Sequence, residues 1–178
     1  ALAIDERSFG SEHPRVATRL NNLAQLLQAT NRPAEAEPLM RRALAIDERS
    51  FGSEHPRVAT DLNNLALLLQ ATNCLAEAEP LMRRALAIDE HSFGSEHPVV
   101  AACLNNLAQL LQATNRLAEA EPLMRRALSI LFTFTRKSGG YEHPYLNGGK
   151  ANYILILKKL GRNDEDVERE IQKLLAEP

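Results

Sequence analysis

Apolar side chains recur at helical spacing in the first part of the chain. Between His13 and Thr30 they stand three or four residues apart on one helix face, at Val16, Ala17, Leu20, Leu23, Ala24 and Leu27. Pro14 suits the first turn of such a helix, because the N–H that proline lacks would have no partner there. Asn31 suits the left-handed conformation that ends many helices. The pattern therefore predicts a helix from about residue 14 to residue 30.

A second helical pattern runs from about Ala34 to about Ser50, with apolar positions at Ala36, Leu39, Met40, Ala43, Leu44 and Ile46. Glu37 and Arg41 stand four residues apart and are expected to form an ion pair. Pro38 lies about one turn into this helix, where it is expected to remove one hydrogen bond and bend the axis slightly. No strand pattern competes, so we expect an all-α protein.

The helix pair repeats with a period of 42 residues. The sequence Ala-Leu-Ala-Ile-Asp-Glu begins at Ala1, Ala43 and Ala85, and a degraded copy begins at Ala127. The first two copies differ only at the pairs Arg19/Asp61, Gln25/Leu67, Arg32/Cys74 and Pro33/Leu75. A period of this length is typical of solenoids, in which each unit buries its apolar face against the next. We therefore expect an α-solenoid of stacked antiparallel helix hairpins that coils into a right-handed superhelix, with the first helix of each repeat on the concave side.

The two ends of the array differ from its middle. The chain opens at Ala1, inside the second helix of a repeat, so the array is expected to open in mid-repeat and to be part of a longer one. A fourth Glu-His-Pro, at 142–144, arrives four residues late, and Lys150 then stands where Leu20 stands in the first copy. We expect near-identical repeats over residues 1–134 and a divergent capping repeat over residues 135–178, because terminal repeats of solenoids carry polar outer faces.

Composition narrows the choice of partners and of compartment. A net charge of −2 and a pI near 6.3 give no electrostatic reason to expect nucleic acid or an anionic membrane. No apolar run of 18 residues is present, so we expect no membrane insertion. Cys74 and Cys103 replace charged residues singly, without the spacing of a metal or disulfide framework. Free thiols in a reducing compartment, the cytoplasm, are the expectation.

Three segments of the second copy resemble the tetratricopeptide repeat: residues 62–66 (LNNLA), 73–81 (NCLAEAEPL) and 84–88 (RALAI). The 42-residue length and the His-Pro-x-Val-Ala opening look most like the kinesin-light-chain type, which is also common in bacterial repeat proteins, so we expect a bacterial array. The resemblance implies close helix contacts at Ala66, Ala78 and Ala85. It also implies a scaffold that holds a peptide or a partner helix in the concave groove. The chain departs from the family in having asparagine where glycine is usual between the helices, at Asn31, Asn73 and Asn115.

A stripe of polar side chains on the first helix of each repeat is the candidate binding surface. Amides both donate and accept hydrogen bonds, as an extended peptide backbone requires, and the family often holds peptide backbone with asparagines at these positions. The residues that we expect to bind peptide are Asn21, Asn22, Gln25, Asn63, Asn64, Asn105, Asn106, Gln109 and Asn152, with Arg15 and Arg57 adding positive charge for an acidic peptide at one rim. The alternative is that one asparagine of each pair braces the next hairpin; we assign binding to the first of each pair and bracing to the second.

No arrangement of side chains indicates catalysis or a metal site. His13, His55, His97 and His143 recur in Glu-His-Pro, too far apart to share a metal ion, and are expected to start helices. Acid pairs such as Asp47 and Glu48 are expected on solvated helix faces. They recur in each near-identical repeat, as structural residues do and a single active site does not. We expect no enzyme activity, no cofactor and no metal.

Three functions remain open at this stage. The first is a non-catalytic protein–protein interaction scaffold. The second is the regulatory or sensor region of a larger signalling ATPase or other multidomain protein, a setting in which near relatives of the family occur. The third is self-association into a homo-oligomer through the open half-repeat at residues 1–10, because near-identical repeats favour exchange of elements between copies.

Overall fold

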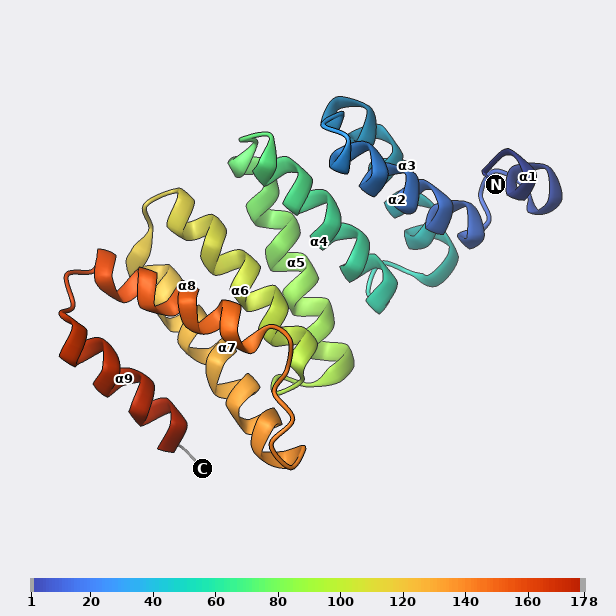
Figure 1. The fold of residues 1–178 in the computed structure, drawn as a ribbon. Coiled ribbons are helices and arrows are strands. Elements are labelled where there is room, and N and C mark those ends of the chain that lie inside the picture. Colours follow the sequence, from blue (N-terminus) through green and yellow to red (C-terminus); the bar gives the residue numbers. More distant parts are fainter. Residues whose placement is uncertain (1, 177–178) are drawn as a thin grey trace. The chain divides into compact units, whose positions relative to one another are not determined.

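The computed structural model describes residues 2–176, and within them every regular element is a helix (Figure 1). The helices are α1 (Leu2–Phe9), α2 (Pro14–Ala29), α3 (Pro33–Phe51), α4 (Pro56–Ala71), α5 (Leu75–Phe93), α6 (Pro98–Ala113), α7 (Leu117–Lys137), α8 (Leu146–Lys159) and α9 (Asp164–Ala176). Residues 1–88 and 89–178 form two compact units, and the boundary between them lies within α5. The predicted all-α array of helix hairpins is confirmed.

A histidine caps the start of each of the helices α2, α4 and α6. The backbone of His13, His55 and His97 is extended, with φ between −82° and −80°. Each ring nitrogen Nδ1 accepts a hydrogen bond from the backbone N–H two residues later, at 3.1–3.2 Å. The ring also packs on a phenylalanine four residues earlier, with centroids 4.8–5.0 Å apart. The histidines therefore satisfy orphan donors of the first helical turn, as the sequence predicts.

An asparagine in the left-handed conformation joins the two helices of each of the hairpins α2–α3, α4–α5 and α6–α7. Asn31, Asn73 and Asn115 have φ values of 59°, 62° and 57°. After α2, the N–H of Arg32 donates to the carbonyl oxygen of Leu27 at 2.8 Å, which closes the helix end. Asparagine thus fills the position that glycine fills in the family, as the sequence analysis expects.

Replacing Asn73 with Gly is expected to change the free energy of unfolding little, and replacing it with Ala to lower that energy by about 1 kcal/mol. Glycine adopts positive φ without strain, whereas a non-glycine residue without a short polar side chain pays for the left-handed conformation. Urea unfolding of both variants provides the measurement. A loss as large for glycine as for alanine would show that the asparagine side chain, and not its backbone conformation, stabilises the turn.

The second helix of each of the first three hairpins accommodates an internal proline. Pro38, Pro80 and Pro122 lie inside α3, α5 and α7, which continue beyond them. The expected pair between Glu37 and Arg41 forms at 2.8 Å, and the Arg41 guanidinium also reaches Glu77 at 2.8 Å. One arginine therefore joins its own helix to the next repeat.

Valine, alanine, leucine and isoleucine side chains build the core of the first unit. Val16, Ala17 and Leu20 of α2 pack with Ala43 and Ile46 of α3. The same five positions one period later make the next cluster, Val58, Ala59, Leu62, Ala85 and Ile88. The alanines leave room for close helix approach, so each hairpin buries its apolar face in the same way.

A second periodic contact links the end of each hairpin to the segment 31–36 residues earlier. Arg42, Arg84 and Arg126 each form an ion pair with a glutamate, Glu6, Glu48 and Glu90, at 2.8, 2.7 and 2.5 Å. Each also donates to the carbonyl oxygen of a serine in the preceding turn, Ser11, Ser53 and Ser95, at 3.0–3.1 Å. These side chains are about one-third exposed, so each pair adds little stability on its own. Their regular spacing fixes the offset between successive hairpins.

The first helix of the last hairpin starts later than its predecessors and buries a different set of residues in its middle. Helix α8 begins at Leu146, two residues after Pro144. Its buried residues Leu146, Gly149, Tyr153 and Ile156 have the same 3-4-3 spacing as Ala17, Leu20, Ala24 and Leu27 of α2. Gly149 is therefore buried in this turn and Lys150 is not. The ends of α8 nevertheless keep the sequence alignment, because His143 and Arg162 make the same backbone contacts as His13 and Arg32.

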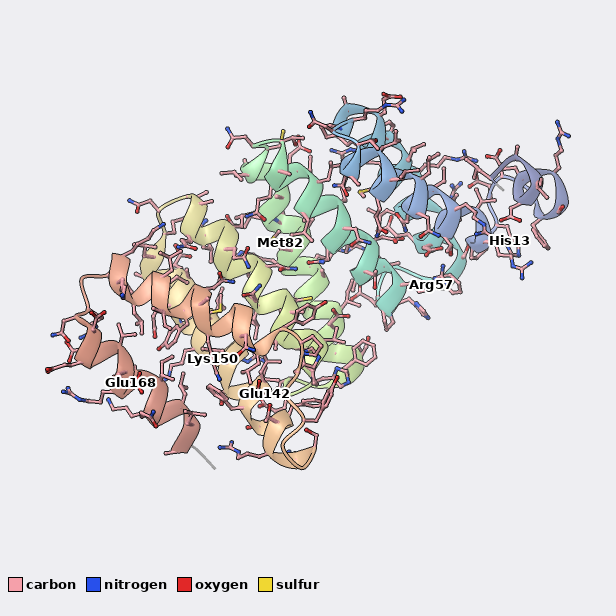
Figure 2. The ribbon with its side chains drawn as sticks, viewed as in Figure 1. His13, Arg57, Met82, Glu142, Lys150 and Glu168 are labelled. Atoms are coloured by element: carbon pink, nitrogen blue, oxygen red, sulfur yellow. The ribbon has the colours of Figure 1, made fainter. Side chains whose placement is uncertain are left out.

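Gly149 allows α7 to lie close to α8. A Cβ atom there would stand 3.2 Å from Cδ2 of Leu128. The neighbouring Lys150 places its amine 5.2 Å from the centre of the Phe132 ring, on the side of α8 that faces α7 (Figure 2). The charged side chain thus makes a cation–π contact outside the core.

Candidate functional site

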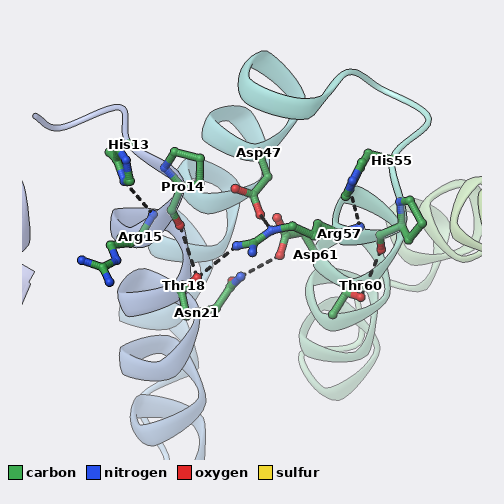
Figure 3. Close-up of polar contacts among 11 residues, drawn as sticks. His13, Pro14, Arg15, Thr18, Asn21, Asp47, His55, Arg57, Thr60 and Asp61 are labelled. Carbon is green, nitrogen blue, oxygen red and sulfur yellow. Dashed lines mark hydrogen bonds and ion pairs between the residues drawn. The ribbon is translucent and has the colours of Figure 1, made fainter. Parts of the chain in front are cut away.

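A polar cavity of about 280 Å³ lies in the first unit, where α2, α3 and α4 meet (Figure 3). It is lined by Thr18, Asn21, Asn22, Gln25, Asp47, Arg57, Thr60, Asp61 and Asn64. Five of these nine residues belong to the predicted peptide-binding set. The structure therefore gathers part of the polar stripe from two successive repeats around one hollow.

The first asparagine of the pair makes the contacts between repeats. Asn21 donates from Nδ2 to Oδ1 of Asp61 at 2.6 Å, which joins α2 to α4. In the second unit, Asn152 of α8 donates to Oδ1 of Asn105 on α6 at 2.9 Å, and Asn105 donates to Asn106 at 3.4 Å. Asn21 and Asn105, each the first of its pair, therefore take part in contacts between helices of different repeats.

The other members of the predicted set lie on the same helices with varying exposure. Asn22 and Gln25 are exposed, whereas Asn63, Asn64, Asn106 and Gln109 are half-buried. The cavity gathers only the members from the first two repeats; Asn63, Asn105, Asn106, Gln109 and Asn152 do not line it, nor does Arg15.

Two aspartates lie buried at the back of the cavity. Asp47 of α3 is 1% exposed and Asp61 of α4 is 3% exposed. The expectation that Asp47 lies on a solvated helix face is therefore wrong, because α4 of the next repeat covers it. Arg57 donates from Nε to Oδ2 of Asp47 at 3.0 Å and from Nη2 to Oγ1 of Thr18 at 3.0 Å. One guanidinium thus spans α2, α3 and α4.

The surroundings of Asp61 change the protonation of its carboxyl group. Burial raises the pKa of Asp61 to about 7; the hydrogen bond from Asn21 opposes this shift, and the nearby Asp47 adds to it. Asp47 remains paired with Arg57. Near neutral pH, Asp61 is therefore divided between its neutral and its charged form.

The partner of this aspartate changes from repeat to repeat. Asp5, Asp47 and Asp89 are equivalent positions, and the residue 14 positions later is Arg19, Asp61 or Cys103. Arg19 forms an ion pair with Asp5 at 2.8 Å, and the Cys103 thiol donates to Asp89 at 3.2 Å. Only in the second repeat do two carboxyl groups meet. Sequence reasoning missed this pair, although the recurring 14-residue spacing and the unusual Asp61 were both visible.

The arginines predicted for the rim make contacts within the protein. The guanidinium carbon of Arg15 lies 4.9 Å from the centre of the Phe9 ring, and that of Arg57 lies 5.0 Å from the Phe51 ring. Arg57 also neutralises Asp47. Its charge is therefore already balanced, which weakens the expectation that it attracts an acidic peptide.

The second unit carries a cavity of a different character. It measures about 570 Å³ and is lined by His97, Pro98, Val99, Ala102, Phe134, His143 and Tyr145. Val99 and Ala102 occupy the positions of Arg57 and Thr60, so the polar side chains of the second repeat are replaced here by apolar ones.

Cys74 is exposed, Cys103 is buried, and both are free thiols, as predicted. Within residues 2–176, no group of three or more His, Cys, Asp or Glu residues is placed to hold a metal ion. Among the helices in that range, none combines the length and the apolar character that crossing a membrane requires.

The paired helices and their 42-residue period define a helical repeat protein. Two family models with the description tetratricopeptide repeat match the chain, one over residues 16–57 and the other over residues 61–131. The chain belongs to the tetratricopeptide repeat family. No curated protein matches it.

Solved structures of kinesin-light-chain type resemble the fold over nearly the whole chain. The nearly identical TPR-like repeats of a Podosopora anserina protein described as a kinesin light chain match with 26% identity and a TM-score of 0.75, over 98% of this chain and 81% of that one. A second structure of those repeats gives 24% identity and a TM-score of 0.77. BtubC (BKLC) from P. vanneervenii gives 24% identity and a TM-score of 0.77, over 91% of this chain and 63% of that one. The expected kinesin-light-chain type of repeat is confirmed.

Proposed function

We propose that this chain holds an extended segment of a protein partner against the first helices of its repeats. Tetratricopeptide repeats are protein–protein interaction scaffolds, and their kinesin-light-chain-like neighbours are typically non-catalytic. The finer proposal concerns the place and the chemistry of binding. The amide side chains on these helices form hydrogen bonds with the peptide backbone of the partner.

The observation that supports this proposal is the polar cavity between α2 and α4. Its lining includes the amides of Asn22, Gln25 and Asn64, from two successive repeats. Asn22 and Gln25 are exposed, so their donors and acceptors face solvent and are available to a ligand. An extended backbone presents alternating donors and acceptors, which such amides satisfy without any change of charge.

The test separates amides that face the cavity from amides that hold the repeats together. Peptides selected on the full chain from a random display library are titrated against the wild type and against the double variant Asn22→Ala, Asn64→Ala. Asn21 and Asn105 are left intact because they make contacts between repeats. Loss of two hydrogen bonds at about 0.5–1.5 kcal/mol each predicts an affinity roughly tenfold or more lower.

Gln172→Ala provides the matched control, since it removes an exposed amide from α9 that bonds only within that helix. Its affinity for the selected peptides is expected to equal that of the wild type. Unchanged binding by the double variant would overturn the proposal that these amides hold the partner.

A further inference from the structure

Three buried oxygen atoms around the polar cavity have no hydrogen-bond partner. They are Oδ1 of Asn21, Oδ1 of Asp47 and Oδ2 of Asp61. All three are hydrogen-bond acceptors, and two of them belong to aspartates that are at least 97% buried. A buried acceptor without a donor is costly, and a buried carboxylate is more so. When Asp61 is ionised, the cavity therefore has a surplus of acceptors and a negative charge that Arg57 does not balance.

We infer that this cavity is a subsite for one cationic side chain, lysine or arginine, of the bound protein segment. The inference rests on the proposed function and adds to it the chemistry of one ligand residue. An ammonium or guanidinium group supplies several N–H donors and a positive charge, which is what the three oxygens lack. A neutral donor leaves the charge unbalanced, and an anion is repelled.

The size of the cavity suits such a group. Its volume of about 280 Å³ is several times the roughly 30 Å³ that one water molecule occupies in the liquid. The polar side chains of Thr18, Thr60 and Asn64 line the rest of the hollow, and their oxygen atoms can accept hydrogen bonds from the cation. The hollow is therefore large enough to admit the head of a lysine or arginine side chain.

Arg57 already provides one cation at the edge of this site. Figure 3 shows its guanidinium pointing toward Asp47 of α3 and Thr18 of α2, close to Asp61. The Arg57 side chain is 43% exposed, whereas that of Asp47 is 2% exposed. Rotation of Arg57 toward solvent is the movement that uncovers the carboxylates. Arg57 is thus an internal competitor of the ligand cation.

The other repeats lack this site because no second carboxyl group stands at the position of Asp61. Arg19 stands at the position of Asp61 and pairs with Asp5. In the third repeat a neutral thiol, Cys103, stands there and donates to Asp89. The single change to aspartate in the second repeat therefore places the subsite at one point of the array.

A proton competes with the cation for the same carboxyl pair. The charged groups that face Asp61 are Asp47 from α3 and Arg57 on its own helix, while α2 presents the neutral Asn21 and Thr18. Since the pKa of Asp61 is about 7, binding of a cation is expected to strengthen as the pH rises through neutrality. Between pH 6 and pH 8 the ionised fraction of Asp61 rises about tenfold, and the affinity should follow it.

The experiment uses two short probes that differ in one side chain. Ac-Gly-Arg-Gly-NH₂ and Ac-Gly-Gln-Gly-NH₂ are titrated into the full chain at pH 6 and pH 8, and the side-chain amide NMR signals of Asn21 and Asn64 are followed. The arginine probe is expected to shift these signals saturably, about tenfold more tightly at pH 8, and the glutamine probe is expected to leave them unchanged. Asp61→Asn should abolish the response to arginine. Arg57→Gln should strengthen it several-fold.

Cys103→Ser is the matched control, because it changes the equivalent position of the next repeat and should leave the titration unchanged. An equal response to both probes, or an undiminished response in Asp61→Asn, would overturn the subsite. Neither outcome depends on the peptides selected from the display library. If the arginine probe fails this test while the double variant Asn22→Ala, Asn64→Ala still loses affinity for the selected peptides, the subsite is overturned and the proposed function stands. If the arginine probe binds as expected while the double variant binds the selected peptides like the wild type, only the proposed function is overturned.

Discussion

The wild type should lose stability as the pH rises from about 4 to about 8, and replacing Asp61 with Asn should remove this pH dependence. The pKa of this carboxyl group is 3.8 in an unperturbed chain and about 7 in the folded protein. The folded state therefore holds a proton that the unfolded state releases, and the resulting stabilisation is complete below pH 3.8 and lost as the pH rises through 7. Each unit of pKa shift corresponds to about 1.4 kcal/mol, and solvent near Arg57 screens part of the interaction, so we expect a loss of about 2–3 kcal/mol.

Urea unfolding at pH 5 and pH 8 measures this effect as a difference between wild type and variant. Other carboxyl groups act in the opposite sense: hydrogen bonds to arginine lower the pKa of Asp5 and of Glu35. Subtracting the Asp61→Asn data from the wild-type data cancels those contributions. Asp164→Asn serves as the control, since the Asp164 side chain is 89% exposed. If the wild type and Asp61→Asn show the same pH dependence, the buried acid pair does not exist in solution.

Truncating Leu62 to Ala should lower the free energy of unfolding by about 3 kcal/mol. Leu62 is fully buried in the cluster with Val58, Ala59, Ala85 and Ile88. Removal of a buried leucine side chain costs the transfer energy of the lost atoms and that of the cavity left behind. Leu67→Ala, on the same helix but 38% exposed, is the matched control and should cost less than about 1 kcal/mol.

Hydrogen exchange adds a spatial test of the same variant. Repeat arrays are stabilised by contacts between neighbours, so a defect in one repeat weakens that repeat and its neighbours most. Amide protection in α4 should therefore fall more than protection in α9. A uniform loss over the whole chain would contradict the repeat-by-repeat description and indicate one cooperative unit.

The helices and their turns could be predicted from the sequence because local residues determine them. The expected helix at 14–30 is Pro14–Ala29, and the expected left-handed turn residues have positive φ. Pro14, His13 and Asn31 act on backbone groups within five residues of themselves. Three near-copies of the pattern also removed the ambiguity that a single short helix would leave.

The acid pair and the burial of Gly149 in α8 could not be predicted in the same way. The burial of Asp47 depends on α4, which belongs to the next repeat and supplies Arg57 and Asp61. The place of Gly149 depends on how closely α7 approaches, which no helical period records. Contacts between repeats, and not helices themselves, limit what sequence patterns reveal.

The varying partner of a constant aspartate has a consequence for how such arrays diversify. Position 19 and its equivalents carry arginine, aspartate or cysteine, while the leucines and alanines of the core stay the same. One codon per repeat can therefore alter local charge without repacking any helix. Exchanging Arg19 and Asp61 would move the carboxyl pair by a whole repeat along the chain. Substitution at this one position of each repeat thus changes the order of charged residues along the array.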